Sequence, residues 1–211
     1  MDGRPEGVDH LILGAPDLER GVEEVERRLG VRPAGGGRHP QYGTRNALVA
    51  LGPETYLEVM APDPELPAPD RGRLFRLQEL DRPRLVAWAL RREDIEMTAA
   101  RARDRGVELG PVQEGSRQQP DGTSVSWRLT DPYAVAAGGV VPFLIAWGET
   151  PHPAGGAPDG GELIGLRAGH PEPDAVREEL AALGVDMRVE EGAPPHLIAT
   201  IHAGEGPVPL R

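Results

Sequence analysis

Two polar side chains interrupt otherwise apolar stretches of the sequence, and together they could do chemistry. His10 lies within residues 8–14 (VDHLILG), and Glu58 lies within residues 55–61 (TYLEVMA). A histidine nitrogen beside a carboxylate suits the ligation of Mn, Fe, Ni or Zn, and the same pair suits general acid–base catalysis. A buried glutamate is costly unless it is paired, so the simpler interpretation is a buried His–Glu hydrogen bond that serves only the fold.

The segment that carries both residues is predicted to form one β-α-β-β-β unit. Residues 8–14 are apolar at both parities, which is typical of a strand covered on both faces. Asp17 is predicted to cap a helix over residues 18–29 that ends at a glycine. Two further apolar runs around a Gly-Pro turn predict antiparallel strands. Because side chains alternate along a strand, His10 and Glu58 each share a face with the residues two positions away.

The same unit recurs further along the chain. A strand, an Asp-capped helix and a glycine stop return in RLVAWALRREDIEMTAARARDRGV. The loop RQQPDGT then aligns with RHPQYGT, SVSWRLT with RNALVAL, and VPFLIAWGETP with TYLEVMAPDP. Four elements that recur in order indicate a duplication, and a shortened third copy follows a linker rich in Gly and Pro. We therefore predict modules at residues 6–75 and 82–150, which pair as one domain, and a truncated module at residues 161–211.

Composition narrows the classes of function. The 211 residues carry a net charge of −11, which disfavours a nucleic-acid partner and would attract a cationic small molecule, or serve solubility alone. The absence of cysteine excludes disulfides, thiolate metal sites and cysteine catalysis. No apolar run approaches the roughly 18 residues of a membrane span, and MDGRPEG has no apolar signal region. We expect a soluble, cytoplasmic protein with no membrane partner.

The duplicated pattern, whose first copy opens with V-D-H-L, resembles the vicinal oxygen chelate superfamily. That superfamily includes glyoxalase I, extradiol dioxygenases, and fosfomycin and bleomycin resistance proteins. Over about residues 6–153 the chain is similar to bacterial glyoxalase-like domain proteins, in the stretches RHPQYGTRNALVALG, YLEVMAPDP, PDGTSVSWRL and PFLIAWGETPHP. The resemblance implies an α+β fold of tandem βαβββ modules whose curved mixed sheets surround a cleft, with the third, truncated module at the C-terminus.

In the superfamily, a divalent metal in the cleft is held by the first and last strands of each module. The resemblance thus places His10 and Glu58 at ligand positions and makes them the candidate catalytic pair. The matching residues of the second module are Ala87 and Ile145, which cannot ligate, so half of the expected shell is missing. Two alternatives remain open. The site binds one divalent ion (Zn, Mn, Ni or Fe) with His39 as a third ligand, or it works without a metal.

Four further residues are candidates for binding a substrate. His39 lies on the glycine-rich loop and Asn46 on the strand after it, where ordinary turn chemistry is the alternative role. Arg128 would be an anion clamp if its strand face lines the cleft, and a solvated residue if it does not. Trp88 is a candidate stacking platform, although tryptophans in such strands are more often core residues.

Two classes of function follow for a small-molecule ligand. The first is an enzyme, a lyase, isomerase or dioxygenase, in which His10 and Glu58 polarise vicinal oxygens or move a proton with or without a metal. The second is a non-catalytic protein that sequesters a small molecule, as bleomycin resistance proteins do. Modules are commonly exchanged between subunits in this superfamily, so the resemblance leaves open whether the protein forms a homodimer.

Overall fold

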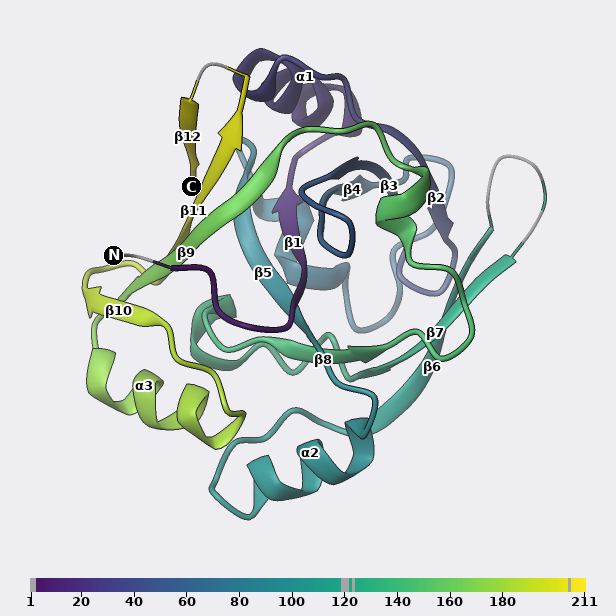
Figure 1. The fold of residues 1–211 in the computed structure, drawn as a ribbon. Helices are drawn as coiled ribbons and strands as arrows, with labels where there is room; N and C mark the ends of the chain where they lie inside the picture. The colour runs from purple at the N-terminus through teal and green to yellow at the C-terminus, as the bar shows by residue number, and fades with distance from the viewer. Residues whose placement is uncertain (1–2, 119–121, 123, 205) are drawn as a thin grey trace.

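Eight strands form a closed barrel in the computed structural model, which describes residues 3–118, 122, 124–204 and 206–211 (Figure 1). Their order around the barrel is β1-β4-β3-β2-β6-β7-β8-β5. The first half consists of β1 (Val8–Gly14), α1 (Leu18–Leu29), β2 (Ala34–His39), β3 (Thr44–Ala50) and β4 (Tyr56–Pro62). The second half consists of β5 (Arg84–Arg91), α2 (Ile95–Arg103), β6 (Val112–Gln118), β7 (Ser124–Thr130) and β8 (Phe143–Ala146). The predicted α+β fold of tandem βαβββ modules is confirmed.

The third unit repeats the same order of elements beside the barrel. It consists of β9 (Glu162–His170), α3 (Pro173–Ala182), β10 (Arg188–Glu191), β11 (His196–Ala203) and β12 (Gly206–Leu210). Its four strands form a separate sheet, in the order β10-β9-β11-β12, that packs on the outside of β5. Two short 3-10 helices, η1 (Leu74–Glu79) and η3 (Pro153–Gly156), lie in the connections between the units, and a third, η2 (Ala136–Gly139), lies between β7 and β8. None of the described helices is long and apolar enough to cross a bilayer.

The first helix illustrates how local sequence fixes an element. The Asp17 side chain accepts a hydrogen bond from the backbone N–H of Arg20 at 2.9 Å, which satisfies one of the free donors at the start of α1. Gly30 ends the helix at φ 74°, in the left-handed region that glycine adopts without strain. The buried side of α1 carries Val22, Val25 and Leu29, which pack on the barrel. The helix therefore begins and ends where the sequence predicts.

The ladder between β1 and β5 relates the two halves by an approximate twofold axis. His10 lies opposite Ala89, and Ile12 lies opposite Ala87. The residue offset that aligns His10 with Ala87 also aligns Ile12 with Ala89. The pair His10–Ala89 and the pair Ile12–Ala87 are therefore equivalent under the twofold axis. Leu11 and Trp88 pair with each other between them, near the axis. The register therefore supports the alignment of Ala87 with His10.

Two hydrophobic clusters separate the inside of the barrel from its outer layers. The outer cluster joins the barrel to the helices and the second sheet, and it contains Trp88, whose side chain is fully buried. The Trp88 indole donates a hydrogen bond from Nε1 to the Val140 carbonyl at 2.8 Å. The inner cluster contains Ile12, Ala87 and Ala89. Trp88 thus faces away from the barrel interior and is a core residue, not a platform inside it.

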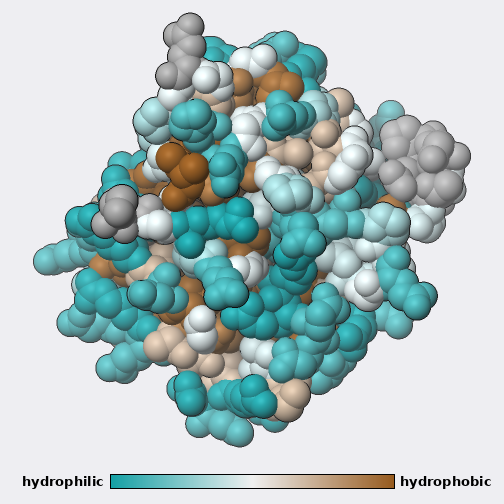
Figure 2. Space-filling model, viewed as in Figure 1, coloured by the Kyte–Doolittle hydropathy of each residue, from teal (hydrophilic) through white to brown (hydrophobic). Residues whose placement is uncertain are grey.

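The solvent-facing surface matches the charged composition. The face drawn in Figure 2 is mostly hydrophilic, and its apolar residues form small separate groups. Large exposed apolar side chains among the described residues are Met97, Val135 and Ile164. They lie far apart in the sequence, and scattered residues of this kind are ordinary at protein surfaces.

Replacing Trp88 by phenylalanine tests its structural role. We expect Trp88→Phe to lower the free energy of unfolding by about 1–3 kcal/mol, because it leaves a cavity and an unpaired buried carbonyl at Val140. Urea denaturation measures this change. The control is Trp127→Phe, at a half-buried residue of β7, which should cost less. A loss at Trp88 of under about 0.5 kcal/mol would contradict the assignment.

Candidate functional site

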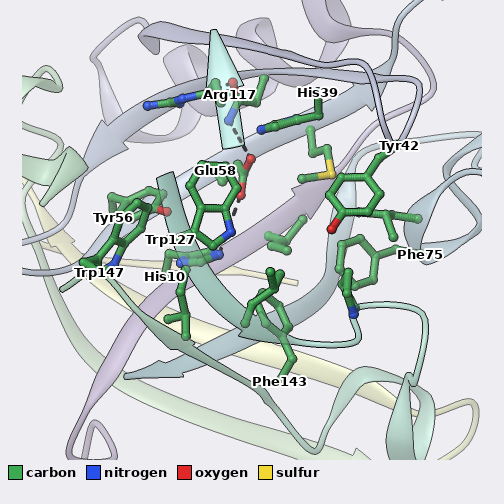
Figure 3. A pocket seen from close by; sticks show the side chains of 17 residues that line it. His10, His39, Tyr42, Tyr56, Glu58, Phe75, Arg117, Trp127, Phe143 and Trp147 are labelled. Atoms are coloured by element: carbon green, nitrogen blue, oxygen red, sulfur yellow. Dashed lines mark hydrogen bonds and ion pairs between the residues drawn. The ribbon is translucent and has the colours of Figure 1, made fainter. Parts of the chain in front are cut away.

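The barrel contains a pocket lined by residues of both halves (Figure 3). Its charged and strongly polar lining residues are His10, His39, Asn46, Glu58 and Arg117, and most of the remaining wall is apolar or aromatic. In Figure 3, Glu58 lies near the centre of the view, with His10 and Tyr56 on one side and Tyr42 and Phe75 on the other. The pocket therefore brings together four residues that the sequence nominated: His10, His39, Asn46 and Glu58.

A β-bulge in the first strand gives His10 its partner. Val8 pairs with Leu90 and His10 pairs with Ala89, so Asp9 is an extra residue without a partner on β5. Strict alternation would send Asp9 and His10 to opposite faces. The bulge instead brings the Asp9 Oδ1 within 2.7 Å of the His10 Nδ1.

Two more donors bind the same carboxylate from the second half of the chain. The Trp147 indole donates from Nε1 to the Asp9 Oδ2 at 3.0 Å. The His152 Nε2 lies 3.2 Å from the same oxygen, and the His152 Nδ1 accepts from the Ala154 N–H, which assigns the hydrogen to Nε2. Asp9 is fully buried, and these contacts supply the partners that a buried carboxylate needs.

The charge of Asp9 determines which nitrogen of the His10 ring carries the hydrogen. Burial by itself raises the pKa of Asp9, but the hydrogen bonds and charges of His10 and His152 outweigh it and hold the pKa below its usual value. Asp9 is therefore a carboxylate that accepts the hydrogen of the His10 Nδ1. Tyr56 stacks on the imidazole, with ring centroids 4.6 Å apart and an angle of 18° between planes. The fixed ring directs its Nε2 into the pocket.

A hydrogen bond from Asn46 orients the Glu58 carboxylate, as the contact with Asp9 orients His10. The Asn46 Nδ2 donates to the Glu58 Oε1 at 2.5 Å, and the Asn46 Oδ1 accepts from the backbone N–H of Gly37 at 2.7 Å. The other carboxylate oxygen, Oε2, lies 3.7 Å from the His10 Nε2. This separation is too long for a direct hydrogen bond. His10 and Glu58 are therefore not a purely structural hydrogen-bonded pair, and both present a proton-accepting atom to the same region of the pocket.

His39 is a neutral member of the lining. Its Nδ1 lies 3.1 Å from the Thr44 Oγ1, and its ring is almost completely buried. Burial lowers the pKa of His39 to about 4, the charge of Arg117 acts in the same direction, and Glu58 opposes both. At neutral pH this histidine is uncharged, and it can contribute a hydrogen bond but no charge to a bound molecule.

Arg128 and Trp88 lie elsewhere. The residues of β7 that line the pocket are Trp127 and Leu129, so Arg128 points out of the barrel, where it forms an ion pair with Glu96 of α2. Trp88 belongs to the outer core. Alternation correctly placed Arg128 on the strand face opposite Trp127. The sequence could not show which of the two faces lines the inside of the barrel.

The residues present do not fit a divalent metal. Ala87 stands where the second half would supply a histidine, and the residues of β8 and its end that line the pocket are Phe143, Ile145 and Trp147. The β5–β8 ladder places Phe143 beside Ala89, as Glu58 lies beside Ile12, so by this register Phe143 replaces the predicted Ile145. Within the described part of the chain, no three His, Asp or Glu side chains gather as a metal site would require, with or without His39.

The burial of His39 predicts a pH-dependent stability. The unfolded chain binds a proton at His39 below pH 6.5, whereas the folded protein binds it only below about pH 4. Stability should therefore fall as the pH falls through this window, by about 3 kcal/mol from this residue. Urea denaturation between pH 7 and pH 4 should show a smaller fall for His39→Gln. The control variant is His202→Gln, at an exposed histidine, which should keep the pH profile of the wild type. Equal pH profiles for His39→Gln and wild type would contradict the prediction.

Comparison with known proteins identifies the family. A family model described as a glyoxalase-like domain matches residues 8–184. A hypothetical protein from Staphylococcus aureus has a similar structure, with a TM-score of 0.69 and 16% identity over 94% of this chain and 92% of its own. Methylmalonyl-CoA epimerase from Mycobacterium tuberculosis gives a TM-score of 0.45 at 21% identity, over 70% of this chain and 92% of the epimerase. No curated protein matches. The chain belongs to the glyoxalase-like domain family, within the vicinal oxygen chelate superfamily.

Proposed function

We propose that the protein is an enzyme that transfers a proton within a small organic molecule, as an isomerase or a lyase does. One observation supports this most strongly. The His10 Nε2 and the Glu58 Oε2 face each other across 3.7 Å in the barrel pocket, and each side chain is oriented by a buried hydrogen bond. Oriented proton-carrying groups are a requirement of general acid–base catalysis.

The proposed reaction begins at a carbon next to a carbonyl group. One of the two groups, His10 or Glu58, removes a proton from this carbon, and the electron pair of the broken C–H bond moves onto the carbonyl oxygen as an enolate. That group, now protonated, returns a proton. When the first carbon carries a hydroxyl group, the hydroxyl proton moves to the enolate oxygen and the carbon-bound proton returns to the former carbonyl carbon, which completes an isomerisation. If a leaving group departs from the neighbouring carbon instead, the electron pair forms a double bond and the reaction is a lyase reaction.

The walls of the pocket favour such an intermediate. Aromatic and aliphatic residues of both halves, among them Phe143, Ile145 and Met60, surround the two reactive groups. An apolar surrounding strengthens electrostatic interactions and limits the access of water to an enolate. The steps written above use only His10 and Glu58 as proton carriers.

Sequestration of a small molecule is the second candidate, and one observation favours it. The second half presents only apolar residues, including Ala87 and Phe143, where the first half presents its polar pair. A binding protein would need the shape and apolar surface of this pocket but no proton-accepting group. Substitution of Glu58 separates the two candidates, since binding by shape should survive it and proton transfer should not.

Proton transfer can be detected without knowledge of the natural substrate. We expect the protein in D₂O to exchange carbon-bound hydrogen for deuterium in at least one of 2-oxobutyrate, levulinate, dihydroxyacetone and methylglyoxal, as followed by proton NMR. Glu58→Gln and His10→Gln should lower the exchange rate by about a hundredfold or more, because each removes one of the two proton-carrying groups. Glu54→Gln, which breaks an exposed ion pair with Arg91, is the matched control and should exchange at the wild-type rate. Exchange that persists in Glu58→Gln, or exchange of none of the four compounds, would contradict the proposal.

The role of Asp9 gives a second test. Asp9→Asn keeps the size of the side chain but removes the charge that fixes the His10 tautomer, so the exchange rate should fall about a hundredfold. His152→Gln is the matched control, because it removes one partner of Asp9 and leaves the contact with His10. We expect a loss of less than about fivefold in that variant. Equal losses in both variants would show that Asp9 acts only through the general packing of the site.

A further inference from the structure

Arg117 is a buried cation with few partners. It lies on β6 with 7% of its surface exposed, and it lines the barrel pocket. Its NH1 lies 3.5 Å from the Asn46 Oδ1, at the outer limit of a hydrogen bond. Its Nε is buried and has no hydrogen-bond partner among the described residues. None of the described carboxylates forms an ion pair with it, whereas the surface residues Arg38 and Arg71 pair with Asp63 and Asp131.

A guanidinium group in this position has a physical requirement that the protein alone does not meet. Removing a charge from water is costly unless hydrogen bonds and an opposite charge replace the water. Arginine also stays protonated, so it cannot become neutral as a buried histidine does. The missing partner is therefore expected to be an anion that binds in the pocket.

We propose that Arg117 binds the carboxylate of an organic acid that occupies the barrel pocket. The planar fork of a guanidinium group matches a carboxylate with two parallel hydrogen bonds. The apolar wall of the pocket suits the hydrocarbon body of the same molecule. As a statement about the substrate this rests on the proposed function, but the anion site itself rests only on the environment of Arg117.

Asn46 places the anion site next to the reactive pair. Its Oδ1 faces Arg117 and its Nδ2 binds Glu58, so one amide group lies between the cation and the candidate base. A carboxylate on Arg117 would bring carbons only a few bonds away next to Glu58. The positive charge of Arg117 would also reduce the repulsion between the bound carboxylate and Glu58.

Arg117 also lines a second hollow that shares part of its lining with the barrel pocket. This hollow includes Trp147, His152 and the glycine-rich residues Gly35 and Gly36 of β2. Arg117 and Trp147 belong to the lining of both spaces, so the guanidinium group stands in the wall between them. An anion can therefore be held at Arg117 at the boundary between solvent and the reactive pair. The acidic net charge suggested a cationic ligand, whereas this local charge favours an anionic one.

A pair of probes that differ only in charge tests the proposal. Butyrate and the neutral butyramide are compared by ligand-observed NMR and by the fluorescence of Trp127 and Trp147, which line the pocket. We expect the wild-type protein to bind butyrate at least about tenfold more tightly than butyramide, and Arg117→Gln to lose this preference. The matched control is Arg128→Gln, which changes the same residue type on the outer face of the adjacent strand and should keep the preference. Arg117→Lys, which keeps the charge but not the fork, should bind butyrate with intermediate affinity.

The outcomes separate this proposal from the proposed function. Equal binding of both probes by the wild type, no binding of butyrate up to about 50 mM, or an intact preference in Arg117→Gln would overturn the anion site. Competition by inorganic phosphate would show that the site accepts any oxyanion, and its absence would restrict the site to carboxylates; both results support an anion site. The wild-type comparison needs no variant, so a folding defect of Arg117→Gln does not prevent the test. The same preference in Glu58→Gln, with no deuterium exchange in any variant, would retain the anion site and reject proton transfer.

Discussion

The buried carboxylate of Asp9 is the interaction on which the arrangement of the site depends. It accepts hydrogen bonds from His10 in its own strand, from Trp147 after β8 and from His152 before η3. These donors come from three different parts of the chain, so a single anion joins the first half, the second half and the connection to the third unit. Its charge is satisfied only when all three segments are in place. The fold therefore fixes the tautomer and orientation of His10 by the same contacts that close the structure.

The two halves of the barrel contribute different kinds of residues to the pocket. The first half supplies Asp9, His10, Asn46 and Glu58, the residues to which we assign proton transfer and the orientation of the proton carriers. The second half has apolar residues at the corresponding inner positions but contributes Arg117 from β6 and Trp147 after β8. The second half therefore does more than preserve the fold. It adds a positive charge and part of the wall, so the pocket has one side with His10 and Glu58 and another side with Arg117.

Much of this architecture could be predicted from the sequence, because it depends on periodicity and repetition. The α1 boundaries follow from Asp17 and Gly30, and the residues gathered in the pocket follow from polar side chains within apolar strands. What was missed depends on tertiary detail. Asp9 escaped because a β-bulge breaks the alternation on which the prediction relied, and the bulge has no signature in V-D-H-L. Arg128 was nominated because alternation assigns residues to two faces without saying which face is inside. Arg117 was missed because the sequence placed it in the loop RQQPDGT, whereas β6 extends to Gln118. Trp88 lies near the axis between the halves, and only the closed barrel shows that its side chain points outward.

The state of the His10 imidazole is the most direct test of this account. Long-range nitrogen–proton correlation NMR of the histidine side chains, assigned with a His10→Gln variant, distinguishes the two neutral tautomers. The account predicts that the neutral ring carries its hydrogen on Nδ1, bound to Asp9, and leaves Nε2 free to face Glu58. Asp9→Asn should abolish this tautomer preference. A neutral His10 with its hydrogen on Nε2 in the wild-type protein would contradict the account, because the proposed base would then already be occupied.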